Sequence, residues 1–137
     1  ELSKNSLNGV KFRGALGDEE LIKALKSASV YVLPSIREGQ SITTLEAMAS
    51  GTPQVTIEAP GNATVELVKN SKSGVVVFPT PEAIGKAIIS LLKDYELWLE
   101  LQRNGYNYIK GLGWDKAAEQ YLQTYEILLG KEINLGL

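Results

Sequence analysis

Two glutamates, Glu38 and Glu46, lie eight residues apart in a segment that contains a turn and the apparent start of a helix. A carboxylate binds vicinal hydroxyls well, because each of its oxygens accepts charge-assisted hydrogen bonds. A ribose offers such a pair of hydroxyls, and so does a hexose. These residue types at this spacing therefore suit a site that holds two polyols.

The segment between the two acids suits a phosphate. Ser41 is a residue type that commonly caps helices, and the first free amides of such a helix would belong to residues 42–44. Free amides and the positive end of the helix dipole attract anions. Gly39 lets the backbone approach a ligand closely, since it has no Cβ. The amides must outweigh the repulsion between a phosphate and the carboxylates of Glu38 and Glu46.

The residues alone leave a plainer interpretation open. Gly39 would then be a simple turn and Ser41 a routine helix cap. Glu38 would be a solvated loop acid and Glu46 an exposed helix residue, because short acidic motifs recur by chance.

Composition narrows the function classes. The chain has 137 residues, 44% hydrophobic and 22% charged, which suits one soluble domain with a core. The net charge of -2 gives no sign of a general nucleic-acid binder. The absence of cysteine and histidine excludes disulfides, thiolate metal sites and the commonest general base. Because the chain begins at Glu1, we expect a processed start or, preferably, an excised fragment.

Strand-like and helix-like segments alternate along the chain. Short β-prone runs predict strands at residues 10–12, 30–33, 54–57 and 75–78, and the second and fourth of these are continuously apolar. Apolar spacing and capping residues predict helices after an Asp18 cap, over 42–50, over 64–69, after Thr80 and Pro81, over 96–109 with Gly105 as a weak point, and after an Asp115 cap. This alternation favours an α/β fold, a Rossmann-like parallel sheet with helices on both faces.

The predicted fold gives the acidic segment a position. Ligands of open parallel sheets bind outside the carboxyl ends of the strands. Glu38 follows the apolar run 30–33, which Pro34 closes, so it lies just past such an end. The position raises the weight of the functional interpretation relative to the plainer one.

An ordered set of motifs resembles a known family. They are Leu33-Pro34-Ser35, Glu38-Gly39, residues 45–49 and Gly51-Thr52-Pro53. The set resembles the retaining glycosyltransferases of GT-B fold, more narrowly the glycosyl transferases group 1, whose signature is Glu, seven residues, Glu. The similarity extends over residues 10–129, including 10–14, 74–77 and the approach to the last helix.

The resemblance implies roles for individual positions. Glu38 would be the catalytic residue and would contact the hydroxyls of the donor sugar in the active site. Donor binding would further involve Gly39, Gln40, Ser41 and Ile42 through backbone amides on the diphosphate, Glu46 on the ribose, and Gly14, Ala15 and Leu16 around the base. The family transfers a sugar from a nucleotide-sugar with retention and generally needs no metal ion, so we expect no metal and no cofactor.

Two departures from the family pattern stand out. The family usually has Glu-Gly-Phe-Gly, whereas this turn has Gln40 and Ser41 after Glu38 and Gly39. Members also have an earlier strand with a Gly-rich turn, a basic pair that grips the diphosphate, and an N-terminal acceptor domain. Arg13 and Arg37 do not occupy the positions of that basic pair.

The resemblance therefore implies a partial domain. We expect residues 1–137 to be a single C-terminal nucleotide-sugar-binding domain that lacks the first strand or strands of the full donor domain. Each lost charged contact to a phosphate is worth about 1.5–3 kcal/mol, so losing two weakens donor binding by roughly two to four decades. We expect the isolated fragment to be inactive and the parent to be a glycosyltransferase of the hexosyltransferase kind.

The expected partners are a nucleotide-sugar and the missing N-terminal acceptor domain of the parent, with no nucleic acid. The resemblance implies glycoconjugate or polysaccharide biosynthesis in the cytoplasm and leaves open a peripheral membrane association of the parent. A non-catalytic nucleotide-binding or scaffold domain is the alternative, and the change at Gln40 and Ser41 keeps it open.

Other notable side chains are interpreted as structural. We expect Trp98, Trp114 and the tyrosines at 106, 108, 121 and 125 to pack in the interior. Part of the apolar face of the last helix is expected to be exposed without the acceptor domain. Glu58 and Glu66 flank a loop and are expected to be solvated.

Overall fold

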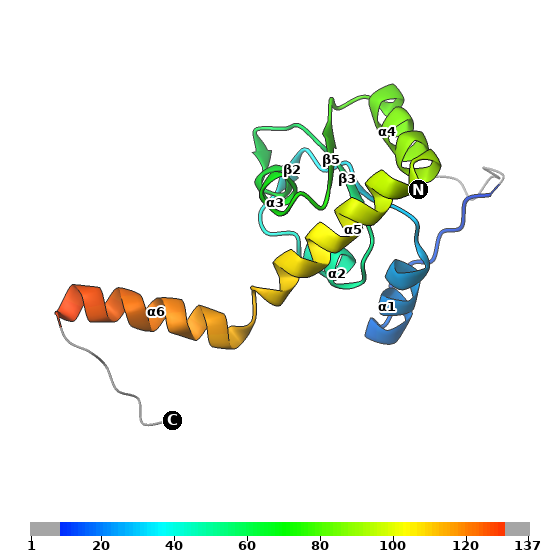
Figure 1. Ribbon diagram of the computed structural model, residues 1–137. Coiled ribbons are helices and arrows are strands. Elements are labelled where there is room, and N and C mark those ends of the chain that lie inside the picture. Colours follow the sequence, from blue (N-terminus) through cyan, green and yellow to red (C-terminus); the bar gives the residue numbers. More distant parts are fainter. Residues whose placement is uncertain (1–8, 131–137) are drawn as a thin grey trace.

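A three-stranded parallel sheet forms the centre of the molecule in a computed structural model that describes residues 9–130. Its strands are β1 (Tyr31–Leu33), β3 (Gln54–Ile57) and β5 (Gly74–Val77), in the order β1-β3-β5 (Figure 1). Val55 is the register partner of Val32 on one side and of Val75 on the other. A second, two-stranded parallel sheet joins β2 (Arg37–Glu38) to β4 (Gly61–Asn62).

The helices are α1 (Asp18–Ser27), α2 (Ile42–Ala49), α3 (Thr64–Ser71), α4 (Pro81–Lys93), α5 (Tyr95–Lys110) and α6 (Trp114–Leu129). Helices cover both faces of the main sheet, as two neighbouring residues of β3 show. Val55 packs with Ala87 and Leu91 of α4, whereas the neighbouring Gln54 donates a hydrogen bond to the Thr44 carbonyl of α2. The predicted Rossmann-like arrangement of helices around a parallel sheet is therefore confirmed.

The main core lies between the sheet and the pair of helices α4 and α5. Its buried members are Val55, Ala87, Leu91 and Leu101, and partly buried valines of all three strands extend it. Further along the chain, α5 approaches α2 closely at Gly105. A Cβ on Gly105 would lie 3.0 Å from the Cβ of Ser73 and 3.5 Å from the Cγ of Met48 in α2. Gly105 is therefore a position of close helix contact, which the interpretation as a weak point missed.

Several local predictions agree with the structure. The strand predicted over 54–57 has the same bounds as β3. Ser41 caps α2, and its hydroxyl accepts a hydrogen bond from the Thr44 amide. Thr80 caps α4 in the same way through the Ala83 amide, with Pro81 as the first residue of the helix.

Other local predictions are wrong. Residues 10–12 form no strand and pair with no other residue that the structure describes, and Phe12 is 72% exposed. A strand needs a hydrogen-bonded partner, which a short β-prone run does not supply by itself. Asp18 and Asp115 are not caps, because Gly17 and Gly113 occupy the cap positions. Both acids lie in a first helical turn, where a negative charge still favours the helix dipole.

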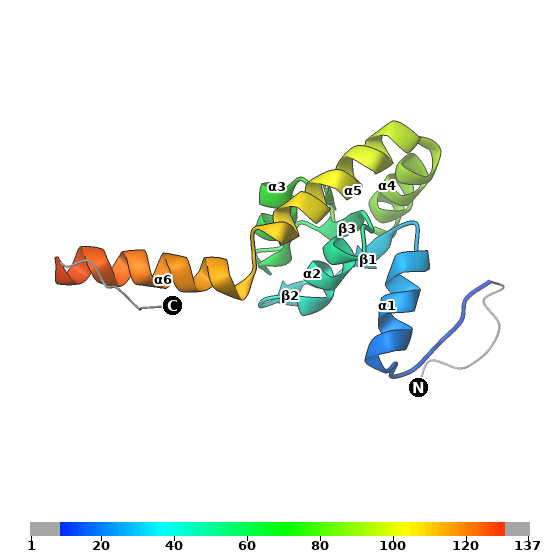
Figure 2. The ribbon, with the colours of Figure 1, turned by 60° about the horizontal axis from the view of Figure 1, so that its bottom comes forward.

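The helix α6 extends away from the rest of the described chain (Figures 1 and 2). None of its residues is buried, and Trp114 is 91% exposed. The packing predicted for Trp114, Tyr106, Tyr121 and Tyr125 is therefore wrong, since all four are exposed. The exposure expected for the apolar face of this helix is confirmed.

Trp98 is partly buried, as the packing prediction requires. Its indole Nε1 donates a 2.6 Å hydrogen bond to the Ser29 carbonyl, and its ring stacks on Tyr95 with centroids 6.3 Å apart. The contact joins α5 to the segment that leads into β1.

Candidate functional site

The turn after β1 and the loop after β3 meet at the carboxyl edge of the main sheet. They meet because β2 pairs with β4 in parallel, with Glu38 opposite Asn62. The Ala63 amide adds a 2.9 Å hydrogen bond to the Glu38 carbonyl. Glu38 is therefore held by main-chain bonds at the edge where open parallel sheets bind ligands.

A groove with a volume of about 650 Å³ opens at this edge. Glu38 contributes one part of its wall, and the loop after β3 and the start of α3 contribute the rest. The lining residues are Glu38, Glu58, Ala59, Pro60, Gly61, Asn62, Ala63, Val65, Glu66 and Lys69.

The N-terminus of α2 follows Glu38 by three residues. Ser41 is 4% exposed, and its hydroxyl accepts hydrogen bonds from the amide and the hydroxyl of Thr44 at 3.2 and 2.8 Å. The Thr44 amide is thus occupied, which reduces the predicted set of three free amides. Within residues 9–130, the amides of Ile42 and Thr43 donate to no protein acceptor. Those two amides form the available positive end of α2.

The two glutamates differ in their surroundings. Glu38 is half-buried and lines the groove, whereas Glu46 is half-buried on α2 and is not among the lining residues. Neither carboxylate has a hydrogen-bond or ion-pair partner among the described residues. Both side chains are therefore free of competing contacts within this part of the chain.

The predicted base-binding residues precede α1. Gly14 and Ala15 are exposed, and Leu16 is half-buried. Gly14 has φ +67, and no other atom lies within 4 Å of the position that its Cβ would take. None of these three residues lines the groove with Glu38, so their role stays a prediction.

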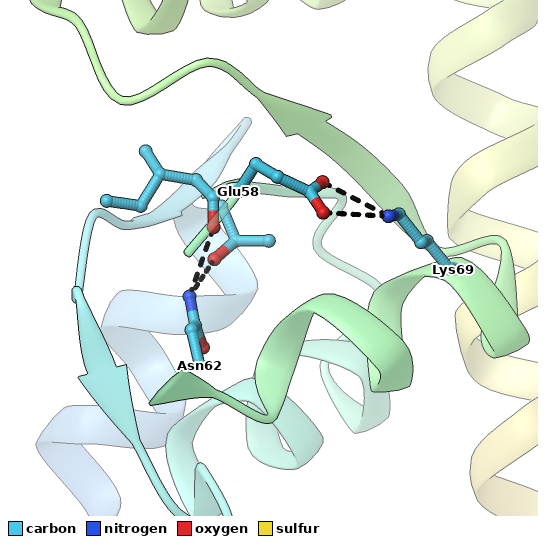
Figure 3. Close-up of polar contacts among 5 residues, drawn as sticks. Glu58, Asn62 and Lys69 are labelled. Carbon is cyan, nitrogen blue, oxygen red and sulfur yellow. Dashed lines mark hydrogen bonds and ion pairs between the residues drawn. The ribbon is translucent and has the colours of Figure 1, made fainter. Parts of the chain in front are cut away.

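The sequence interpretation missed Asn62, which is only 4% exposed. Its Nδ2 lies within hydrogen-bond distance of the Ser35 carbonyl (2.9 Å), the Thr56 hydroxyl (3.1 Å) and the Ile57 carbonyl (3.3 Å). Its Oδ1 accepts a 3.0 Å hydrogen bond from the Thr64 amide at the start of α3. Figure 3 shows the Asn62 side chain directed at the end of β3. A single local signal pointed to it, since asparagine is common at helix starts.

The sequence interpretation also missed an ion pair across the loop after β3. Lys69 Nζ lies 3.2 and 3.1 Å from the two carboxylate oxygens of Glu58 (Figure 3). Both side chains are more than half exposed, so water screens the pair and its energy is small. The pair still offsets one of the three acids that line the groove, the others being Glu38 and Glu66.

Within residues 9–130, no helix is both long enough and apolar enough to cross a bilayer. In the same residues no three histidine, cysteine, aspartate or glutamate side chains gather in a way that could hold a metal ion.

Parallel strands flanked by helices, with a groove at the carboxyl edge, define a Rossmann-like α/β protein. Residues 2–108 match the family described as Glycosyl transferases group 1. The chain therefore belongs to this glycosyltransferase family.

Relatives come from distant organisms. An uncharacterized glycosyltransferase of Methanocaldococcus jannaschii is 32% identical over 122 residues, which are 88% of this chain and 31% of that protein. Sucrose-phosphate synthase 4 of Arabidopsis thaliana is 32% identical over 104 residues, which are 75% of this chain and 10% of that protein. The D-inositol 3-phosphate glycosyltransferase of Streptomyces avermitilis is 29% identical over 116 residues, 85% of this chain and 25% of that protein.

A solved structure supports the same fold. The sucrose-phosphate synthase of Thermosynechococcus elongatus superposes with a TM-score of 0.72 at 30% sequence identity. The match covers 88% of this chain and 30% of that protein. The chain thus spans less than a third of the length of each of these relatives.

Proposed function

We propose that this chain is the nucleotide-sugar-binding part of a retaining glycosyltransferase whose remaining part binds the acceptor. In this proposal residues 1–137 are a partial C-terminal donor domain. Reaction takes place in a cleft between the two parts of the parent, so the isolated chain has no activity of its own. The short share of each relative that the chain matches supports a larger parent.

The observation that carries the proposal is the pair of free amides at the start of α2, next to Glu38. The Ile42 and Thr43 amides are the donors that a diphosphate needs, and the helix dipole adds to their attraction. Glu38 lines the adjoining groove, where its free carboxylate can accept hydrogen bonds from the donor sugar.

The remaining roles extend from this centre. Glu46 accepts hydrogen bonds from the ribose hydroxyls, and residues 14–16 surround the base. During transfer the leaving diphosphate gains negative charge, and amides that already point at it stabilise that charge without reorganisation. The proposal therefore needs no metal ion. A cytoplasmic enzyme of glycoconjugate or polysaccharide biosynthesis is the setting that we propose for the parent.

The substitution of serine for the usual glycine at position 41 is compatible with the proposal. The Ser41 side chain is 4% exposed, and its hydroxyl is engaged by Thr44 inside the first turn of α2. It therefore points into the helix and leaves the approach to the Ile42 amide open. This geometry favours an intact donor site over the alternative of a degenerate scaffold.

The proposal is tested with the full-length protein and the variant Glu46→Gln. UDP, GDP and ADP are titrated by calorimetry, and nucleoside diphosphate release is measured from the corresponding nucleotide-sugars. A charged hydrogen bond is worth about 1.5–3 kcal/mol, so we expect the affinity for the preferred nucleotide to fall roughly tenfold to a hundredfold.

The matched control is Glu66→Gln, which neutralises a groove carboxylate that has no proposed donor contact. Equal affinities of the wild type and Glu46→Gln would remove Glu46 from the ribose role. Nucleotide binding without any sugar release would support the scaffold alternative.

A further inference from the structure

We propose that Asn62 is a positioning residue that holds Glu38 in the geometry needed for sugar transfer. The inference rests on the proposed function, because it assigns a support to the residue placed at the donor sugar. Asn62 is one of the residues that line the groove, but it is only 4% exposed and both ends of its amide are engaged by neighbouring groups, so it acts through those neighbours.

The side-chain amide nitrogen of Asn62 contacts more than one segment of the chain. One Nδ2 lies within hydrogen-bond distance of Thr56 and Ile57 at the end of β3 and of Ser35 in the loop between β1 and β2. Thr56 continues the connection, because its hydroxyl donates a 3.0 Å hydrogen bond to the Leu33 carbonyl. The segment between Leu33 and Glu38 is thereby held at its start and at its middle.

Main-chain contacts connect the segment of Asn62 to Glu38 itself. Asn62 is the register partner of Glu38 in the two-residue ladder between β2 and β4. The next amide, that of Ala63, donates to the Glu38 carbonyl at 2.9 Å. A ladder this short has little stability of its own, so its geometry depends on the side chain that anchors one strand.

The side-chain oxygen of Asn62 makes a separate contact with α3. Its Oδ1 accepts the Thr64 amide, which fixes the start of α3 relative to β4. Both ends of one buried amide group are therefore used, and no other side chain described at this edge joins as many segments. Loss of the amide would free the ladder that carries Glu38.

The test uses the full-length protein with Asn62→Ala and the isosteric Asn62→Asp. The aspartate keeps an acceptor for the Thr64 amide, but it presents an oxygen to the Ser35 and Ile57 carbonyls in place of a donor. Asn62→Asp thus remains informative if Asn62→Ala fails to fold. A small displacement of a reacting group can cost about a hundredfold, so we expect kcat to fall roughly tenfold to a hundredfold. KM for the nucleotide-sugar is expected to stay within about threefold, since the polar atoms of the Asn62 side chain are already engaged by protein groups.

The matched control is Thr52→Val. Thr52 is 3% exposed and donates a 2.7 Å hydrogen bond to the Leu25 carbonyl, at the amino end of β3 and away from the groove. This variant also loses one buried hydrogen bond, so it lowers the melting temperature without moving Glu38. We expect its kcat to stay within about twofold of the wild type.

A double-mutant cycle separates the two proposals. In a Glu38→Gln background, Asn62→Asp is expected to lower kcat no further, because its effect passes through Glu38. If Glu38→Gln leaves sugar transfer unchanged, the proposed function fails. If Glu38→Gln lowers kcat while Asn62→Asp behaves like Thr52→Val, or if the two effects simply add, the positioning role is overturned and the proposed function stands.

Discussion

The body of the molecule, α1 to α5 with the two sheets, contrasts with α6. Both contain amphipathic helices of similar length, since α5 and α6 have 16 residues each. In α5 the apolar side chain of Leu101 is 7% exposed, whereas Leu128 of α6 is 73% exposed. Helical spacing of apolar residues therefore predicts a helix, but it does not reveal whether another part of the molecule covers the apolar face of that helix.

The two regions also differ in how far apart in the sequence their polar partners lie. In the body Trp98 donates to Ser29, 69 positions earlier in the chain. On α6 the Lys116 ammonium contacts Glu119 at 2.8 Å, one turn away. The hydrogen bond and charge of Glu119 raise the pKa of Lys116. Contacts that close long loops constrain a fold, whereas contacts within one turn only support a helix that already exists.

A leucine in the core of the body should contribute far more to stability than a leucine on α6. Leu91→Ala removes a side chain that is 2% exposed from the core cluster with Val55. We expect it to lower the free energy of unfolding by about 2–5 kcal/mol, because the cavity adds to the lost burial. Urea unfolding of the 137-residue chain measures the change.

Leu128→Ala is the matched control on α6. Its side chain is 73% exposed, so we expect a change within about 0.5 kcal/mol. A loss at Leu128 as large as that at Leu91 would mean that α6 packs against the body in solution, and the comparison would fail.

Much of the body could be predicted because its signals are local. The β-prone residues of β3 and the caps Ser41 and Thr80 are signals close in sequence, and each agrees with the structure. The failures depend on distant partners. Residues 10–12 have strand-like residues but no strand beside them, and Trp114 has no surface to cover it among the described residues.

Two helical glycines, Gly105 and Gly85, differ in the space around the position of a Cβ. A Cβ on Gly105 would lie 3.0 Å from Ser73, whose hydroxyl is fixed 2.8 Å from that of Ser71. The overlap offsets the gain in helix propensity, so we expect Gly105→Ala to destabilise the chain by about 1 kcal/mol.

Gly85 in α4 has open space around the position of its Cβ. We therefore expect Gly85→Ala to stabilise the chain by about 0.5–1 kcal/mol, and thermal unfolding of the two variants side by side checks the opposite signs. Stabilisation by both substitutions would show that α5 can withdraw from Ser73 at no cost.

The candidate site follows the same division between local and distant signals. The position of Glu38 at the sheet edge and the cap of α2 were predictable, since a carboxylate and a helix start after an apolar strand are visible in one short segment. The pairing of β2 with β4 and the contacts of Asn62 were not. A two-residue ladder has no periodicity to detect, and Asn62 reaches Ser35 across 27 positions of sequence.

Substitutions at the helix caps of α4 and α6 are expected to change stability the least. Thr80→Ala removes the hydroxyl that accepts the Ala83 amide at the start of α4, and we expect a loss of about 1 kcal/mol in the stability of the body. At the start of α6, Gly113 has φ -71 and ψ 157 and no side-chain cap, so a serine fits there without strain. We expect Gly113→Ser to stabilise α6 by a few tenths of a kcal/mol.

Because nothing of α6 is buried, this gain should appear in the amide hydrogen exchange of residues 114–120 and leave the unfolding midpoint of the body unchanged. A shift of that midpoint would show that the two regions unfold together. Unchanged exchange in α6, with Thr80→Ala behaving as expected, would show that the helix gains nothing from a serine cap at its first turn.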